Sequence, residues 1–139
     1  MAIITRTIRV RSKGENDIMD ITTPTSKAIE ESMVKQGVVT VFVAGSTAAI
    51  TTIEYKPGLR NDFPRMLNRI IPKDIEYKHD ETWHDGNGHS RVRASLIGTG
   101  LTVPFEDGNL ILGTWQQIVL LELDTRSRER SITIQIIGE

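Results

Sequence analysis

The sequence of 139 residues has no cysteine, no long hydrophobic run and no excess of charge of either sign. Without cysteine the protein forms no disulfide, holds no zinc through thiolates and has no cysteine nucleophile, which leaves histidine, carboxylate and hydroxyl groups for chemistry. No apolar segment approaches the roughly 20 residues that cross a bilayer, and the N-terminus lacks the pattern of a secretory signal. We therefore expect a cytoplasmic protein that has no membrane partner.

Charge is nearly balanced, with 17 Lys and Arg against 18 Asp and Glu and a formal net charge of -1. A chain without a net positive field does not attract polyanions over a distance. We expect no nucleic acid as a partner, and any bound anion must be held by a local group of donors.

The length is typical of one domain, and apolar and charged residues make up 38% and 25% of the chain, as in folded proteins. Predicted strands outnumber predicted helices and cluster near the C-terminus. We predict a single domain over residues 1–139, of the α+β class, with a few helices and a mixed or largely antiparallel sheet.

Alternation of apolar and polar residues predicts several half-buried strands. The first, over residues 4–11, has a basic polar face, and residues 17–22 can pair back with it. The last, over residues 130–137, is expected to pair antiparallel with its predecessor over 115–123. Residues 38–43 are nearly all β-branched or aromatic, which predicts a strand buried on both faces. The remaining predicted strands cover residues 48–55, 101–105 and 110–112.

Capping residues and apolar spacing predict two helices in the first half of the chain. The first runs to Gln36, has Ile29 and Met33 four residues apart, and ends at Gly37. The second is preceded by a turn at Pro57-Gly58, is capped by Asn61 or Asp62, and ends at Pro72.

Residues 73–87 are polar and irregular, which predicts a long surface loop. A third, short helix is expected after this loop. Asn87 is its N-cap, Val92 and Leu96 with Ala94 or Ser95 face inward, and Gly98 closes it.

All three histidines lie within eleven residues, in segment 79–91 with the sequence HDETWHDGNGHSR. Imidazoles and carboxylates are the groups expected at a metal site or in acid–base chemistry near neutral pH. The histidines are spaced five apart, which no helix or strand face aligns, so only a folded loop can bring them together. The alternative is a solvated polar loop followed by a helix cap, in which Asp85 and Asn87 satisfy local backbone donors.

Three further features are weaker signals. Gly45-Ser46-Thr47 lies between two predicted strands and either holds a phosphate or forms a plain glycine turn. Trp115, before Gln116-Gln117, is expected in the core rather than as a stacking platform. Glu54 and Glu122 lie in apolar strands, where a carboxylate faces outward or pairs with a cation such as Arg60 or Arg130.

A set of short motifs follows one another in a recognisable order along nearly the whole chain. It comprises Ser46-Thr47-Ala48, Glu54, Arg60, Asp62, Tyr77, His79, Asp85, Asn87, His89-Ser90, Ala94-Ser95-Leu96-Ile97-Gly98, Val103-Pro104, Asp107-Gly108, Leu112-Gly113-Thr114-Trp115-Gln116 and Glu122. This series resembles the YjbQ-like family, which is often labelled secondary thiamine-phosphate synthase.

The resemblance implies a single α+β domain, a homotrimer, and a pocket that contains the histidine-rich segment at the subunit interface. Members of the family are linked to a weak, secondary thiamine-phosphate synthase activity, which joins a pyrimidine methyl diphosphate to a thiazole phosphate and releases pyrophosphate.

The sequence departs from the family pattern at three positions. Gly45 stands where many members have His, His89-Ser90-Arg91 stands where the family often has His-x-His, and Gly100 stands where a Ser is common. Two imidazoles are therefore missing, and Arg91 can bind phosphate oxygens bidentately where a metal or a histidine would otherwise act.

The sequence thus suggests a transferase of this type that acts on phosphorylated small molecules. The assigned roles are phosphate binding by Ser46, Thr47, Arg91 and Gln116, proton transfer or leaving-group polarisation by His79 and His89, and orientation or Mg²⁺ binding by Asp85, Asn87 and Glu54. His79 and His89 are the candidate ligands of a Mg²⁺ or Zn²⁺ ion. The alternatives are a non-catalytic trimer that binds a metal ion or anion through the same segment, and a pocket that has lost its activity.

Overall fold

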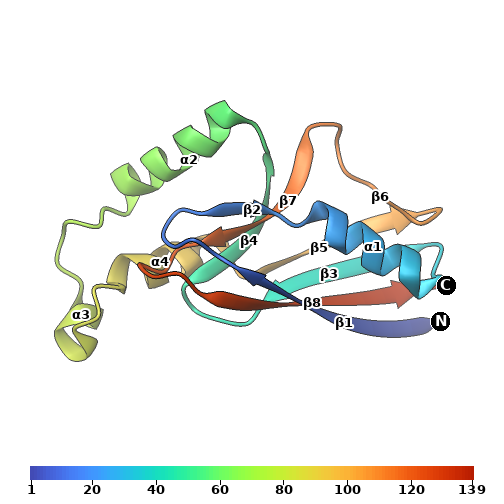
Figure 1. Cartoon of the computed structure of the whole chain (residues 1–139), viewed down its shortest axis with the longest axis horizontal. Helices are drawn as coiled ribbons and strands as arrows, with labels where there is room; N and C mark the ends of the chain where they lie inside the picture. The colour runs from blue at the N-terminus through green and yellow to red at the C-terminus, as the bar shows by residue number, and fades with distance from the viewer.

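The computed structural model describes all 139 residues and contains four helices and eight strands (Figure 1). In chain order the elements are β1 (Ala2–Arg11), β2 (Ile18–Asp20), α1 (Thr22–Ser32), β3 (Gly37–Val43), β4 (Ala48–Glu54), α2 (Pro57–Ile70), α3 (Lys78–Trp83), α4 (Gly88–Ile97), β5 (Gly100–Glu106), β6 (Asn109–Leu110), β7 (Gln116–Glu122) and β8 (Glu129–Gly138).

The strands form two antiparallel sheets, one in the order β1-β8-β3-β5-β6 and one in the order β2-β7-β4. The single-domain α+β fold predicted from the sequence is therefore confirmed. Figure 1 shows α1 near the end of the molecule that holds both termini, whereas α2 and α3 lie toward the opposite end. Each helix is too short or too polar to cross a membrane.

Two apolar clusters hold the sheets and helices together. The larger has 16 buried residues, mainly from α1 and both sheets, and it includes Ile132, Ile134 and Ile136 of β8, which alternate with less buried residues along the strand. The smaller has eight buried residues, among them Leu67 of α2 and Ala94 of α4. Burying one such large aliphatic side chain contributes roughly 1.5–3 kcal/mol, so the clusters fix how the two sheets lie against each other.

Two predicted strand pairings are wrong. β8 pairs with β1 and β3 rather than with its predecessor β7, which pairs with β2 and β4. Likewise β2 lies against β7 and does not return to β1. Residues 118–122 are all buried, so both faces of β7 are covered by other parts of the protein. β7 is the central strand of its own sheet, between β2 and β4.

The prediction that residues 38–43 are buried on both faces is also wrong. Val39, Val41 and Val43 are fully buried, but Val38 and Phe42 are 38% and 44% exposed. The two exposed residues lie on the outer face of the five-stranded sheet, which remains open to solvent.

Two helix boundaries differ from the predictions. α1 ends at Ser32 because Met33 adopts a left-handed conformation with φ 63°, which leaves its side chain exposed and Gly37 at the start of β3. α2 already begins at Pro57, since proline suits the first helical turn. Asp62 therefore lies inside the helix, 3.8 Å from Arg65, and is no cap.

The second half of the chain differs from the predictions in four further respects. The predicted loop over 73–87 contains the helix α3, and the strand predicted over 110–112 is reduced to β6. On α4, Val92 and Leu96 are exposed rather than inward, because the helix turns polar residues toward the protein. Trp115 is 61% exposed, not in the core, and its ring lies 5.0 Å from the Lys56 ammonium.

Glu122 of β7 and Arg130 of β8 form a buried ion pair that joins the two sheets. Arg130 Nε donates to Glu122 Oε1 at 2.9 Å, and Arg130 Nη2 donates to Oε2. The Ser12 hydroxyl, just after β1, donates to the same carboxylate at 2.7 Å. Arg130 Nη2 also donates to the carbonyl and the hydroxyl of Thr47, at 3.2 and 2.8 Å. Glu122 therefore pairs with Arg130, one of the outcomes expected from the sequence.

Asp124, in the β7–β8 turn, connects three segments through its buried carboxylate. It accepts hydrogen bonds from the Thr47 hydroxyl at 3.0 Å, the Asn87 amide at 3.4 Å, the Arg126 backbone N–H at 3.0 Å and Arg128 Nε at 3.1 Å. Burial alone raises the pKa of Asp124, but the hydrogen bonds and the Arg128 charge outweigh burial and lower it below its ordinary value. The turn thus holds the β3–β4 loop and the start of α4 in fixed positions.

Replacing Arg130 tests the ion pair. Arg130→Met leaves the buried Glu122 carboxylate without its partner, which costs about 3–5 kcal/mol of unfolding free energy. Lys27→Met is the control, because the Lys27–Glu31 pair is exposed and such pairs contribute about 0.5 kcal/mol or less. Chemical denaturation measures both variants, and equal losses would contradict the role given to Arg130.

Acid titration tests the buried carboxylate of Asp124. Because its folded pKa lies below the unfolded value of about 3.9, its ionised form stabilises the fold above that pH, and this contribution is lost as pH falls through the folded pKa. We expect Asp124→Asn to be less stable than wild type at neutral pH and the difference to shrink in acid. Asp62→Asn, at an exposed position, should give a curve parallel to wild type. A difference for Asp124→Asn that stays constant down to about pH 2.5 would refute the assignment.

Candidate metal and anion site

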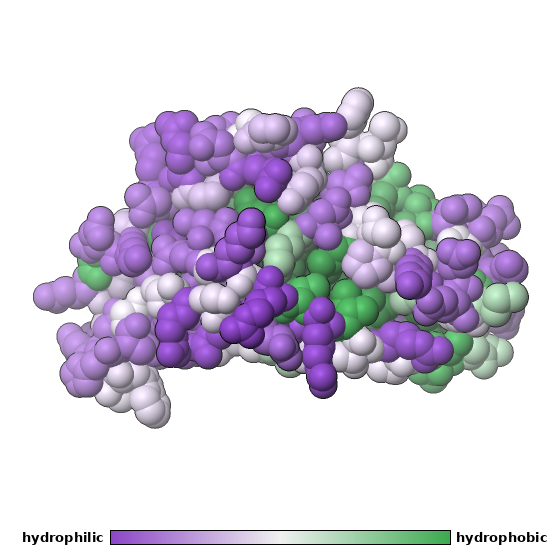
Figure 2. Space-filling view, in the orientation of Figure 1, coloured by the Kyte–Doolittle hydropathy of each residue, from purple (hydrophilic) through white to green (hydrophobic).

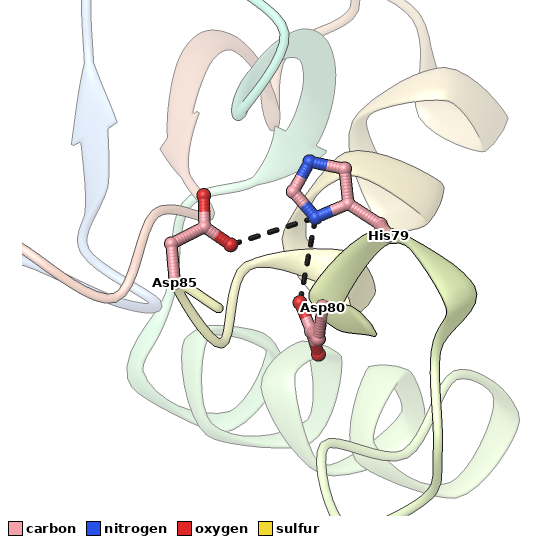
Figure 3. A group of neighbouring side chains, drawn as sticks. All are labelled: His79, Asp80 and Asp85. Carbon is pink, nitrogen blue, oxygen red and sulfur yellow. Dashed lines mark hydrogen bonds and ion pairs between the residues drawn. The ribbon is translucent and has the colours of Figure 1, made fainter. Parts of the chain in front are cut away.

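A short helix and a tight reversal bring His79, Asp80 and Asp85 together. α3 ends at Trp83, and the next residue, His84, adopts a left-handed conformation with φ 55° and donates its backbone N–H to the Asp80 carbonyl at 2.8 Å. The chain then turns back, so that Asp85 comes to lie beside the first turn of α3. Figure 3 shows the Asp80 and Asp85 carboxylates pointing toward the imidazole of His79 from two sides.

The His79 Nδ1 atom lies 3.4 Å from Asp80 Oδ1 and 3.5 Å from Asp85 Oδ1 (Figure 3). Each carboxylate is held by a backbone donor, the Gly88 N–H for Asp80 at 3.0 Å and the Asn87 N–H for Asp85 at 3.1 Å. One imidazole nitrogen and two carboxylate oxygens all lie within 4.8 Å of one another, a donor set that can bind a divalent cation. The same contacts also suit a protonated His79 in an ion-pair network.

Arg91 of α4 lies next to this cluster. Its Nη1 donates to the Ser46 hydroxyl at 2.6 Å, and its Nη2 is 3.9 Å from Asp85 Oδ2. Its Nε is buried without a hydrogen-bond partner. The side chain as a whole is 36% exposed, so its terminal nitrogens can meet an anion from outside the chain. Arg91 and Ser46 therefore form a place where an oxyanion can bind.

Asn87 and Thr47 lie behind these groups and hold the loops in place. The Asn87 side-chain oxygen accepts hydrogen bonds from the Ser90 hydroxyl and the Thr125 N–H, both at 3.2 Å. Asn87 therefore stands at the N-cap position of α4 without a side-chain capping bond to the helix backbone. The Thr47 hydroxyl is already bonded to Asp124 and Arg130. Both side chains are buried and act as positioning residues.

His89 is directed away from His79 and into the protein. It is 1% exposed, and its Nε2 is 3.0 Å from Glu15 Oε1, which also lies 3.6 Å from Lys73 Nζ. One turn further along α4, Arg93 donates two hydrogen bonds to the Ile71 carbonyl. Burial lowers the pKa of Arg93 and raises that of the neighbouring Tyr77. The structure thus separates the two histidines that the sequence offered as joint metal ligands.

Glu54 and Gln116 lie at the far end of β4 and β7 from Ser46. They face each other in the strand pairing, and Gln116 donates to the Thr52 hydroxyl at 3.1 Å in a depression beside Trp115. Seven strand residues span about 20 Å, so neither side chain reaches the Arg91 site of its own chain.

The structure therefore brings together four of the predicted site residues and adds others. His79, Asp85, Arg91 and Ser46 lie in one group, Asn87 and Thr47 support it, and His89, Glu54 and Gln116 lie elsewhere. Asp80, Asp124 and Glu15 also contact these residues and were not among the predicted site residues. Asp80 stands directly after His79, a signal that could have been used, whereas Asp124 and Glu15 are revealed only by long-range contacts.

The hydrophilic surface of the molecule coincides with this end. In Figure 2 hydrophilic residues cover the left half, around α2 and α3, while hydrophobic residues come to the surface mainly in the centre and on the right. A polar surface fits a site that binds small charged ligands.

Comparison with known sequences reveals close similarity over the whole chain. A protein of Methanothermobacter thermautotrophicus, named UPF0047 protein, is 35% identical over 139 residues, which are 100% of this chain and 95% of the relative. A UPF0047 protein of Methanocaldococcus jannaschii is 34% identical over 132 residues, 94% of this chain and 92% of the relative.

Solved structures give the same result. A YjbQ-like protein of unknown function from Sulfolobus solfataricus has a TM-score of 0.89 and 33% identity, over 99% of this chain and 100% of the other. An uncharacterised conserved YjbQ/UPF0047 protein from Clostridium acetobutylicum has a TM-score of 0.82 and 36% identity, over 96% and 99%. The family model described as UPF0047 protein YjbQ-like matches residues 6–139, and the chain belongs to this family.

Proposed function

We propose that the protein is an enzyme that acts on a phosphorylated small molecule, with Arg91 and Ser46 holding phosphate oxygens and the His79–Asp80–Asp85 cluster holding a divalent cation. One observation carries this proposal. The guanidinium of Arg91 lies between the Ser46 hydroxyl and Asp85, on a side chain that is 36% exposed. A guanidinium in this position suits a planar pair of phosphate oxygens better than an ammonium would.

The donor set beside Arg91 fits a divalent cation. An imidazole nitrogen and two carboxylates leave coordination positions open, as in catalytic metal sites, and backbone N–H groups orient both carboxylates. Mg²⁺ and Zn²⁺ are the candidates, with Mg²⁺ suited to the carboxylates and to phosphate oxygens. A bound cation would neutralise negative charge on the phosphate groups. The ligands are His79, Asp80 and Asp85, whereas His89 is occupied by Glu15.

For the reaction we propose the condensation linked to this family, in which pyrophosphate leaves a pyrimidine methyl carbon and the thiazole nitrogen bonds to that carbon. The breaking C–O bond gives its electron pair to pyrophosphate, so no proton has to move in this step. What the chain must supply is positive charge at the leaving group and a fixed orientation of the two substrates. Arg91 supplies the charge, and Ser46, held between Gly45 and Thr47, helps to orient the phosphate.

We also propose that the protein works as a homotrimer. Ile3, Val38 and Phe42 are exposed on the outer face of the five-stranded sheet, where a neighbouring copy would bury them. Assembly is the route by which Glu54 and Gln116, which lie far from Arg91 in one chain, would contribute to a site.

Metal titration tests the cation site and separates the two histidines. We expect wild type to bind one Mn²⁺ or Zn²⁺ ion per chain and His79→Ala to lose at least about tenfold in affinity, since a ligand is removed. His84→Ala is the matched control, because this imidazole is exposed on the same segment and outside the cluster. Isothermal titration calorimetry measures all three. Equal affinities for wild type and His79→Ala would rule out this site.

An activity assay tests the reaction. Purified protein with Mg²⁺ and the two precursors should form thiamine phosphate, and Arg91→Ala should lower kcat by about a hundredfold, as removal of a charge-stabilising donor does. Arg65→Ala, on the exposed surface of α2, should retain wild-type kcat. A folded, trimeric sample that binds metal and phosphate but forms no product would overturn the proposed enzymatic activity and would favour a non-catalytic binding protein.

A further inference from the structure

The β3–β4 loop is touched by a second guanidinium, that of Arg130. Gly45 and Ser46 are exposed, and Thr47 is buried beneath them. Arg91 donates to the Ser46 hydroxyl, and Arg130 donates to the carbonyl and hydroxyl of Thr47. Two guanidinium groups therefore contact consecutive residues of one short loop, whose Cα atoms are about 3.8 Å apart.

One terminal nitrogen of Arg130 lies directly against Gly45. The hydrogen bonds of Arg130 to Glu122 and Thr47 engage Nε and Nη2. Its Nη1 stands 3.0 Å from the point that a Cβ at residue 45 would occupy, and Gly45 has φ +154°. A side chain at this position would press on Nη1 and cover it. The absence of a side chain at residue 45 thus leaves Nη1 next to exposed backbone.

The position of Arg130 is fixed before any ligand arrives. Its guanidinium is 8% exposed and is held by the Glu122 carboxylate, which in turn accepts the Ser12 hydroxyl. A donor that is already ordered binds an oxyanion without a further loss of side-chain freedom. Arg91 contributes a second set of donors through its terminal nitrogens, on a side chain that is 36% exposed.

We propose that Arg130 Nη1 is a further substrate-binding donor and that Gly45 provides access to it, so that the site holds a diphosphate group across Arg91 and Arg130. One phosphate lies at Arg91 and Ser46, and the other lies over Gly45 at Arg130. This inference rests on the proposed function, because it extends the anion site around Arg91. It adds a preference for diphosphate over monophosphate, set by residues 45 and 130.

Calorimetric titration with inorganic pyrophosphate and with inorganic phosphate tests the inference on the full-length protein. Wild type should bind pyrophosphate more tightly than phosphate. Gly45→Ala should weaken pyrophosphate binding by about tenfold, the effect of one charge-assisted hydrogen bond, and leave phosphate binding within about twofold. Gly108→Ala is the matched control, because Gly108 also has a positive φ but a Cβ there meets nothing within 4 Å.

Arg130→Lys provides a second variant in case alanine at residue 45 prevents folding. Lysine keeps a positive partner for Glu122 but removes Nη1 together with the Nη2 hydrogen bonds to Thr47, so pyrophosphate affinity should fall more than phosphate affinity, while Mn²⁺ affinity stays unchanged. Unchanged pyrophosphate binding in both variants, or an equal loss for both anions, would overturn the role of Arg130 and leave the proposed function standing. Wild type that binds neither anion would overturn both.

Discussion

The buried ion pair between Glu122 and Arg130 is the interaction on which the candidate site depends. β7 and β8 follow each other in the chain but lie in different sheets, and this pair crosses from one sheet to the other. A buried carboxylate and guanidinium are tolerated when most of their remaining hydrogen-bonding groups are satisfied, and Ser12, Thr47 and the Asp124 N–H do this while Arg130 Nη1 stays free. Through Thr47 the pair fixes the loop that carries Ser46. The Ser46 hydroxyl, to which Arg91 donates, is therefore positioned by the contact between the two sheets.

The sequence predicted the fold class because alternation reveals which side chains are buried. It did not reveal which strands are neighbours, and for that reason the pairing of β8 with β7 was predicted wrongly. Both strands carry apolar runs that suit the centre of a sheet. Whether they lie in one sheet or in two depends on their partners elsewhere in the chain, which for β8 are β1 and β3. The pairing of Glu122 with Arg130 was foreseen as one option because a carboxylate in an apolar strand needs a cation.

The composition of segment 79–91 singled out the stretch in which His79, Asp80 and Asp85 lie close together, but its spacing could not show where each side chain points. His89 is buried because α4 turns residues 89 and 93 toward Glu15 and Ile71. Asp80 joins the cluster because α3, at six residues too short for a clear apolar period, places it beside His79. The family resemblance supplied Glu54 and Gln116 as site residues without their distances, and the length of β4 separates them from Arg91 within one chain.

Asp85 lies between the His79 cluster and Arg91, so in the proposed function it would couple cation binding to anion binding. Its two oxygens face His79 and Arg91, at 3.5 and 3.9 Å. In the proposed function a cation bound to Asp85 draws negative charge away from Arg91, whose guanidinium then interacts more strongly with phosphate oxygens. An anion at Arg91 in turn adds negative charge beside the cation. Each ligand therefore raises the affinity for the other by the same factor, since coupling between two binding sites is reciprocal.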